Sequence, residues 1–170
     1  MPAGLKATSS TVAIGLTASE TAPNTFQQTQ IDLNLSPLDR EVFVVQAIDL
    51  TLGAPDALAG IDTSMLGSIT TTRQTATQTL ANSNCLAIAA NQIRAAGLVD
   101  GGVGFQQTAG ESPNTLLEYI GIIATNDFFV QVAGQNNATP HSMSGKLYGY
   151  RAPASADVFA ALVQSEVLSA

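Results

Sequence analysis

The sequence predicts an all-β fold: a single jelly roll, that is, an eight-stranded antiparallel β-barrel or sandwich, with an extended N-terminal arm and a short C-terminal helix. Segments in which apolar residues occupy every second position recur along the 170 residues, and this period is typical of half-buried strands. Residues that form turns separate these segments. A helical period occurs only near the C-terminus, so strands and helices do not alternate, and a parallel, doubly wound sheet is disfavoured.

The chain is expected to contain one domain preceded by an arm. Residues 1–25 are rich in Ala, Thr, Ser and Gly, and this composition allows an extended arm, a loosely held strand or a disordered tail. Residues 26–170 form the jelly-roll domain in this interpretation, since neither an internal repeat nor a linker divides them and their number suits one domain. The arm is predicted to become ordered only in an assembly.

Alternation is clearest in the first half of the domain. Residues 28–35 place apolar and polar side chains on opposite faces, and Pro37 ends the predicted strand because proline cannot donate to a ladder. Residues 41–52 predict a long strand. One face of this strand is expected to hold Val44, Gln46, Ile48, Leu50 and Leu52.

The second half contains weaker patterns. The density of β-branched residues in 69–79 predicts a strand. Residues 85–96 are rich in Ala and suit either a strand or a short helix, and the alternation favours the strand. Further strands are predicted at 103–108, 116–124, 127–134 and 144–152. A helix of about ten residues is expected after Asp157, which can cap its N-terminus.

The surface is expected to be polar but poorly charged. Charged residues make up 11% of the chain, against roughly 25% in typical soluble domains. Thirteen Asp and Glu residues against six Lys and Arg residues give a net charge of −7, so a basic footprint for direct nucleic-acid binding is lacking. A surface of this kind is often covered by copies of the same chain or by partners.

The single histidine and the single cysteine limit the chemistry that the chain supports. Cys85 lies in an apolar run, where an inert thiol is expected, and one cysteine excludes an internal disulfide or a cysteine-rich zinc site. His141 would have to activate Ser142 or Ser144 to form a nucleophilic site. Neighbours in one loop rarely have that geometry, and the sequence has no Gly-x-Ser-x-Gly turn.

Other candidate motifs are also weak. Asp39 and Glu41 could share a face at a separation that inverting glycosidases use, but Trp is absent and a charged strand entry beside Arg40 is favoured. The Gly-rich residues 101–104 lack the Lys and Ser or Thr of a phosphate loop and predict a β-turn. Asn34 and Asn137 begin glycosylation patterns that precede proline. We therefore predict no catalytic, cofactor-binding or metal-binding residue, no cofactor and no enzymatic activity.

One stretch of the sequence is similar to a known family. Residues 117–152 combine Ile-Ala-Thr-Asn-Asp at 123–127, Phe-Phe-Val at 128–130, an Asn-rich loop and Tyr-Gly-Tyr-Arg at 148–151. This order resembles the closing strands of small single jelly-roll capsid proteins from icosahedral viruses with an internal membrane, the sphaerolipovirus-like group of haloarchaeal and Thermus viruses. Residues 40–45 resemble the first barrel strand of that family, and residues 159–166 its short helix.

The resemblance implies a viral structural protein located in the capsid shell of the virion. It implies a major capsid subunit that self-assembles into capsomers, with a second capsid protein, above an internal viral membrane and without direct contact to nucleic acid. It supplies no catalytic residue. The low charge departs from the very acidic halophilic members of the family.

A receptor- or carbohydrate-binding β-sandwich, such as a virion spike, is the alternative. Its binding surface would consist of the polar loops 53–62 and 135–144. The aromatic content of 5% disfavours this alternative, because sugar faces stack on aromatic rings.

Overall fold

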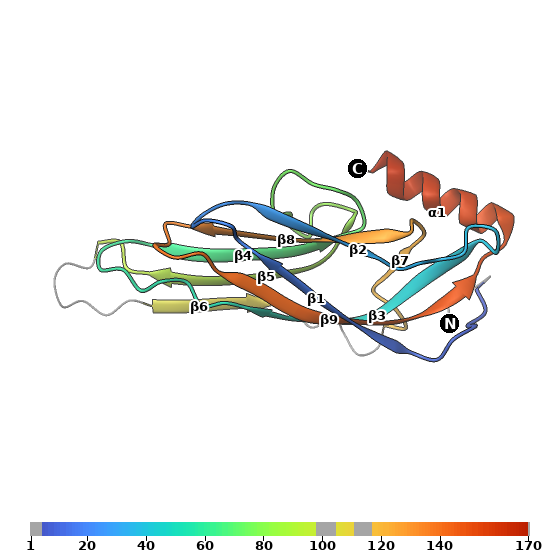
Figure 1. Ribbon diagram of the computed structural model, residues 1–170, viewed down its shortest axis with the longest axis horizontal. Helices are drawn as coiled ribbons and strands as arrows, with labels where there is room; N and C mark the ends of the chain where they lie inside the picture. Colours follow the sequence, from blue (N-terminus) through green and yellow to red (C-terminus); the bar gives the residue numbers. More distant parts are fainter. Residues whose placement is uncertain (1–4, 98–104, 111–116, 170) are drawn as a thin grey trace.

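Two antiparallel sheets face each other in the computed structural model (Figure 1). The structure describes residues 5–97, 105–110 and 117–169, and only the backbone of 105–110. One sheet has the strand order β1-β9-β3-β7, and the other has the order β2-β8-β4-β5-β6. The elements are β1 (Val12–Ser19), β2 (Gln27–Asp32), β3 (Glu41–Leu52), β4 (Thr63–Thr70), β5 (Cys85–Arg94), β6 (Phe105–Gly110), β7 (Gly121–Ile123), β8 (Asp127–Gln135), β9 (Ser142–Pro153) and α1 (Ala156–Leu168).

The strand order is that of a jelly roll. Strands β1, β9, β3 and β7 face strands β2, β8, β4 and β5, and each paired neighbour within the two sheets is antiparallel. This arrangement folds two Greek keys into one sandwich. The all-β, single jelly-roll prediction is confirmed, and β6 extends the second sheet by one strand beyond β5.

The jelly roll begins inside the segment that was predicted to be an arm. Residues 12–19 pair with β9 along their whole length, and Leu16 and Ala18 are buried in the core. Further upstream, Leu5 is buried and forms a bridge with Ala154. The boundary at residue 25 is therefore corrected: apolar residues at alternate positions give 12–19 an inward face, which the general composition of 1–25 conceals.

The long strand β3 has the predicted bounds, but not the predicted face. Its register against β9 shifts between Val45 and Ala47, so Gln46 occupies a β-bulge, which adds one residue to a strand. Ile48 therefore joins the core between the sheets, whereas Val44 packs in a second cluster on the outer side. Before the bulge, Phe43 and Val45 face the core between the sheets, whereas Val42 and Val44 face the second cluster.

The strand predicted at 69–79 is wrong in position. β4 occupies Thr63–Thr70, and residues 71–84 leave the sheet. The threonines after residue 70 have a high β propensity but no apolar partners at alternate positions, and burial decides strand formation more than propensity does. Residues 85–94 form a strand, as favoured. Of the strand predicted at 103–108, residues 103 and 104 lie outside the described residues.

Helix α1 begins two residues earlier than the sequence predicted. Ser155, not Asp157, is the N-cap, and its side chain accepts a hydrogen bond from the backbone N–H of Val158. Asp157 lies in the first turn, where a negative charge suits the helix dipole. The helix runs for 13 residues instead of about ten.

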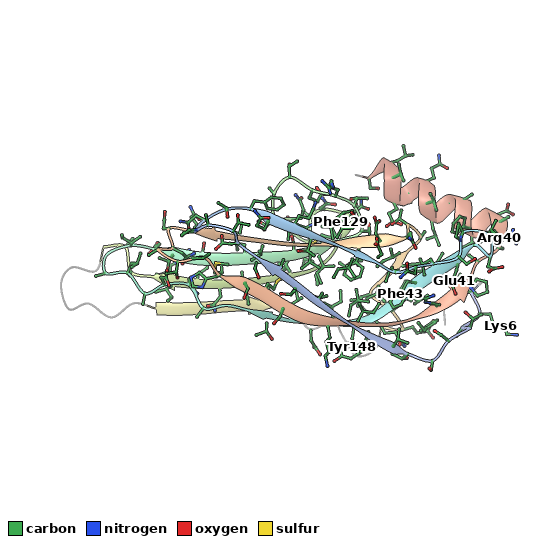
Figure 2. All side chains as sticks on the ribbon, viewed as in Figure 1. Lys6, Arg40, Glu41, Phe43, Phe129 and Tyr148 are labelled. Carbon is green, nitrogen blue, oxygen red and sulfur yellow. The ribbon has the colours of Figure 1, made fainter. Side chains whose placement is uncertain are left out.

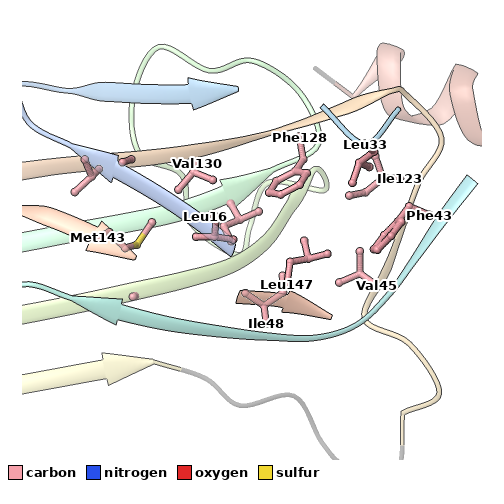
Figure 3. Packing of buried hydrophobic residues seen from close by; sticks show 14 of the residues in the cluster. Leu16, Leu33, Phe43, Val45, Ile48, Ile123, Phe128, Val130, Met143 and Leu147 are labelled. Atoms are coloured by element: carbon pink, nitrogen blue, oxygen red, sulfur yellow. The ribbon is translucent and has the colours of Figure 1, made fainter. Parts of the chain in front are cut away.

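The main core fills the space between the sheets. Figure 3 shows Leu16, Phe43, Val45, Phe128 and Leu147 pointing toward one another from both sheets. The second cluster lies on the outer side of the four-stranded sheet. There, α1 and the segment before β1 cover the outward side chains of β3 and β9, namely Val42, Val44, Tyr150 and Ala152.

Candidate functional site

His141 lies in the loop between β8 and β9, and its ring faces an acid rather than a serine. The Nε2 atom is 3.3 Å from Oδ1 of Asp56 and 3.4 Å from Oγ1 of Thr139. Within the described part of the chain, no hydrogen bond joins the His141 ring to Ser142 or Ser144. The geometry therefore lacks the nucleophile that a histidine–carboxylate pair would activate.

Loops 53–62 and 136–141 lie at the end of the sandwich opposite α1 (Figure 1), and Asp56 links them. Its carboxylate accepts hydrogen bonds from the backbone N–H groups of Ala138 and Thr139, both at 2.8 Å, and from the Thr139 hydroxyl. The Thr139 amide is the main cause that lowers the pKa of Asp56, with a smaller contribution from His141. An ionised Asp56 thus ties loop 53–62 to loop 136–141.

A third loop joins this end through Glu20 and Asn137. The Glu20 carboxylate is 7% exposed and accepts from the backbone N–H groups of Gly134 at 2.7 Å and His141 at 3.0 Å. The Asn137 side chain accepts from the amide of Asp56 and donates to the carbonyl of Ser64. Because Asn137 is buried and bonded in this way, its glycosylation pattern is closed in the folded chain.

We call this group of three loops the loop end (20–26, 53–62 and 136–141). Its carboxylates already have hydrogen-bond partners within the chain. Each carboxylate named above accepts hydrogen bonds from backbone N–H groups. Among the described residues, no group of three or more His, Cys, Asp or Glu side chains could hold a metal ion. A cleft of about 260 Å³ lies beside the loop end. Its polar lining includes Asp62, Ser64, Gln92, Arg94, Gln135 and Asn136.

The side chains of Asp39 and Glu41 bond to neighbouring residues of the chain. The Asp39 carboxylate accepts from the Ser36 hydroxyl at 2.8 Å, and the Glu41 carboxylate accepts from the Ser36 amide at 3.1 Å. Glu41 further lies 3.7 Å from Nη1 of Arg151. The two acids therefore fix the turn before β3.

Asn34 and Cys85, two further candidates from the sequence, have structural surroundings. Asn34 has a φ of 51°, and its carbonyl accepts from Arg151. Cys85 is half-buried, and desolvation raises the pKa of its thiol, which disfavours the reactive thiolate. The Gly-rich residues 101–104 lie outside the described residues.

Glu166 is a structural anchor that the motif search missed. It is 6% exposed, and its carboxylate accepts from the amides of Ala124 and Thr125 and from the Thr125 hydroxyl. Asn84 donates to its backbone carbonyl at 3.0 Å. The available signal was its position: Glu166 falls on the apolar stripe of the helix, where a carboxylate must find buried donors.

A nearly uncharged surface lies on the outer side of β1, β9 and β3, on the part of the sheet that α1 and the segment before β1 do not cover. Its side chains alternate with those that enter the core, and the β1–β9 and β3–β9 registers place them in rows across the three strands. They are exposed to solvent. We define this surface, the open face, by Ala13, Gly15, Thr17, Ser19, Asp49, Thr51, Ser142, Ser144 and Lys146.

Comparisons with known proteins add little to this picture. No model of a protein family matches the chain, and no curated protein matches it either. Among solved structures, a chain from Desmodium yellow mottle tymovirus is similar at 14% sequence identity and a TM-score of 0.32, covering 92% of this chain and 95% of that chain. The fold is assigned from the strand order.

The helical part of the described chain offers no membrane span. None of its helices combines the length and the apolar character needed to cross a bilayer.

Proposed function

We propose that the chain is a structural protein of a virus particle, a capsid subunit that assembles with copies of itself into an icosahedral shell. The observation that carries this proposal is the open face: a nearly neutral, exposed surface on one side of a jelly roll. The virion is accordingly its proposed location. The likeness of residues 117–152 to sphaerolipovirus-like capsid proteins supports the same proposal.

The distribution of charge suits a subunit that packs against many neighbours. Glu20, Asp56, Asp62 and Glu166 each accept hydrogen bonds from the chain's own backbone N–H groups. Broad contacts between identical subunits suffer less repulsion when few charges lie on them. The net charge of −7 still favours solubility before assembly.

The finer features of this proposal concern partners. A second capsid protein and an internal membrane beneath the shell are part of it, because the family resemblance implies both. The acidic balance of the chain opposes direct contact with nucleic acid. We propose no enzymatic activity, since the His141–Asp56 pair lies without a serine in reach and the loop-end carboxylates are used for folding.

One observation favours the alternative function. The loops that a receptor- or carbohydrate-binding module would use do meet at the loop end, where Asp56 joins them. However, residues 53–62 and 135–144 contain no Phe, Tyr or Trp. These two loops therefore lack the aromatic stacking platform that carbohydrate sites use, so this function ranks second.

The experiment that tests the proposed function is a measurement of native mass. Light scattering over a concentration series, with and without the second capsid protein, is expected to show capsomers or larger symmetric particles that electron microscopy then resolves. A strict monomer under all these conditions would contradict the proposal. Saturable binding of that monomer to a glycan array would establish the alternative.

A further inference from the structure

We propose that the open face is a contact between two copies of this chain, related by a two-fold axis, in which Lys146 of each copy faces Asp49 of the other. The proposal rests on the proposed function and names the surface that it uses. It commits to a second copy as the occupant because the charges of the face are complementary to themselves.

Asp49 and Lys146 are the charged members of the open face. They lie directly opposite each other in the β3–β9 register, and both are exposed. Neighbouring strands lie about 4.8 Å apart, so the acid and the base stand side by side on an outer surface. The adjacent pair on one side is Thr51 with Ser144, which adds hydroxyl groups but no charge.

The strand order turns this pair into a self-complementary pattern. Consider a two-fold axis that lies between the copies, parallel to the strands and midway between β3 and β9. Rotation about this axis places β3 of one copy over β9 of the other, so Lys146 meets Asp49 twice. Isologous contacts need such self-complementarity, and the opposed charges set the register.

The rest of the face permits close approach. Ala13, Gly15 and Thr17 on β1 continue the rows of β9, and none of them projects a long side chain. The Thr17 hydroxyl already donates to the carbonyl of Met143 at 3.1 Å, so its burial would leave no donor unpaired. Figure 2 shows the larger Tyr148 on the outer side of the four-stranded sheet, where the register places it opposite Ala13.

The charge pattern also disfavours other occupants. One positive and one negative group in the same row cancel, so the face has no net charge to attract nucleic acid or an anionic membrane. A partner of a single charge would leave one of the two groups unpaired in the contact, which is costly. A second copy satisfies both groups at once.

The expected contact is weak by itself. The axis midway between β3 and β9 overlays these two strands, so two strands at about 4.8 Å and eight residues at about 3.3 Å give an area of roughly 250 Å² per copy. Stable interfaces bury about 800 Å² per partner, so an isolated pair should associate only at high concentration. Repeated around a particle, the same contact gains through multivalency.

The test uses two single charge changes, D49K and K146D, in the full chain. Each variant places like charges opposite each other in the proposed contact, so we expect self-association to weaken by about tenfold or more at low salt. A mixture of the two variants restores opposite charges at both positions, so association between unlike copies should recover. Sedimentation with one variant carrying a fluorescent label measures this recovery.

The mixture separates a contact between copies from a role within one chain. If the Asp49–Lys146 pair only stabilised its own sheet, the defect of each variant would persist in the mixture, because neither chain regains the pair. The double variant D49K/K146D provides the folded control and should associate with itself. Melting temperatures of all four proteins show that each one folds.

The outcomes also distinguish this proposal from the proposed function. Normal assembly by both single variants, or a failure of the mixture to recover, overturns the assignment of the face and leaves the capsid function standing. Assembled particles in which the amides of 49–51 and 142–148 exchange hydrogen as fast as in free subunits overturn it as well. A wild-type chain that never associates overturns both proposals.

Discussion

The outer surfaces of the two sheets bear similar polar side chains but differ in solvent exposure. On the five-stranded sheet, Ser68, Thr70 and Gln131 point outward yet have no exposed surface, because residues 71–84 cover them (Figure 1). On the four-stranded sheet, the hydroxyl groups of Thr51 and Ser144 remain exposed. Residue type therefore does not decide which polar surface is closed.

The covered surface shows what closing a polar face requires. Gln131 donates to Thr70 at 2.6 Å and to Gln28 at 3.1 Å, and it accepts from Ser68 at 2.8 Å. The covering segment adds the backbone N–H of Gln78, which donates to Ser68. Since a buried polar group without a partner is costly, the chain closes this face with a network in which each member is bonded. The open face has no such segment among the described residues, and a second copy would have to supply the cover.

The covering of the second cluster by α1 gives the largest expected effect. Glu166→Ala removes the acceptor for the amides of Ala124 and Thr125 and leaves them buried beneath the helix. Hydrogen bonds to charged groups each contribute about 1.5–3 kcal/mol, so we expect a loss of about 3 kcal/mol in the free energy of unfolding. Urea denaturation followed by circular dichroism measures it.

The control for this change lies on the same helix. Gln164 is exposed, so Gln164→Ala should alter the free energy of unfolding by less than about 0.5 kcal/mol. Equal effects of the two substitutions on the free energy of unfolding would show that the hydrogen bonds of Glu166 do not stabilise the fold.

The network under residues 71–84 gives the next largest effect. Gln131→Ala removes the acceptor of the Ser68 hydroxyl and a donor to the Thr70 hydroxyl in a closed site, where each unsatisfied group costs about 1–3 kcal/mol. Allowing for relaxation, we expect a loss of about 2 kcal/mol in the free energy of unfolding and faster hydrogen exchange in 71–84. Gln135, exposed on the same strand, is the matched control. A fully protected 71–84 in Gln131→Ala would mean that the network does not hold the cover.

Apolar alternation allowed much of the fold to be predicted, and long-range covering explains where the prediction failed. Residues 41–52 and 127–135 carry enough apolar residues to identify their strands. β4 was misplaced because Ser68 and Thr70 are buried beneath residues 71–84, a covering that the pattern within the strand does not reveal. The two loops 53–62 and 135–144 were predicted to share a surface, but the bond that joins them was not, because Asp56 meets Thr139, 83 positions away, only after the topology forms.

The acid stability of the loop end follows from the pKa of Asp56. Donation from the Thr139 amide, the largest cause, holds this pKa below the ordinary value of 3.8. A depressed carboxylate stabilises the fold above the unfolded pKa, and that contribution is lost as the pH falls through the folded pKa. Because Asp56 is solvated, we expect a smaller effect than at Glu166.

Asp56→Asn isolates this contribution. The difference in free energy of unfolding between wild type and Asp56→Asn should be constant from pH 7 to pH 5 and shrink below about pH 3.8. Urea denaturation across this range measures it. A difference that stays constant down to pH 2.5 would show that the carboxylate charge does not tie the loops.

The smallest expected effect tests the comparison most directly, because it sets one serine against another. Ser68 on the covered face donates to Gln131 and accepts from the Gln78 amide, so Ser68→Ala should lower the free energy of unfolding by about 1–2 kcal/mol. Ser144 on the open face is exposed, and water replaces whatever its hydroxyl loses, so Ser144→Ala in the monomer should change the free energy by less than about 0.5 kcal/mol. Both substitutions remove the same atom from a strand of the same jelly roll, so any difference measures the cover and not the residue. Equal losses at the two positions would mean that the open face is already closed in the isolated subunit, and a second copy would then have nothing to cover.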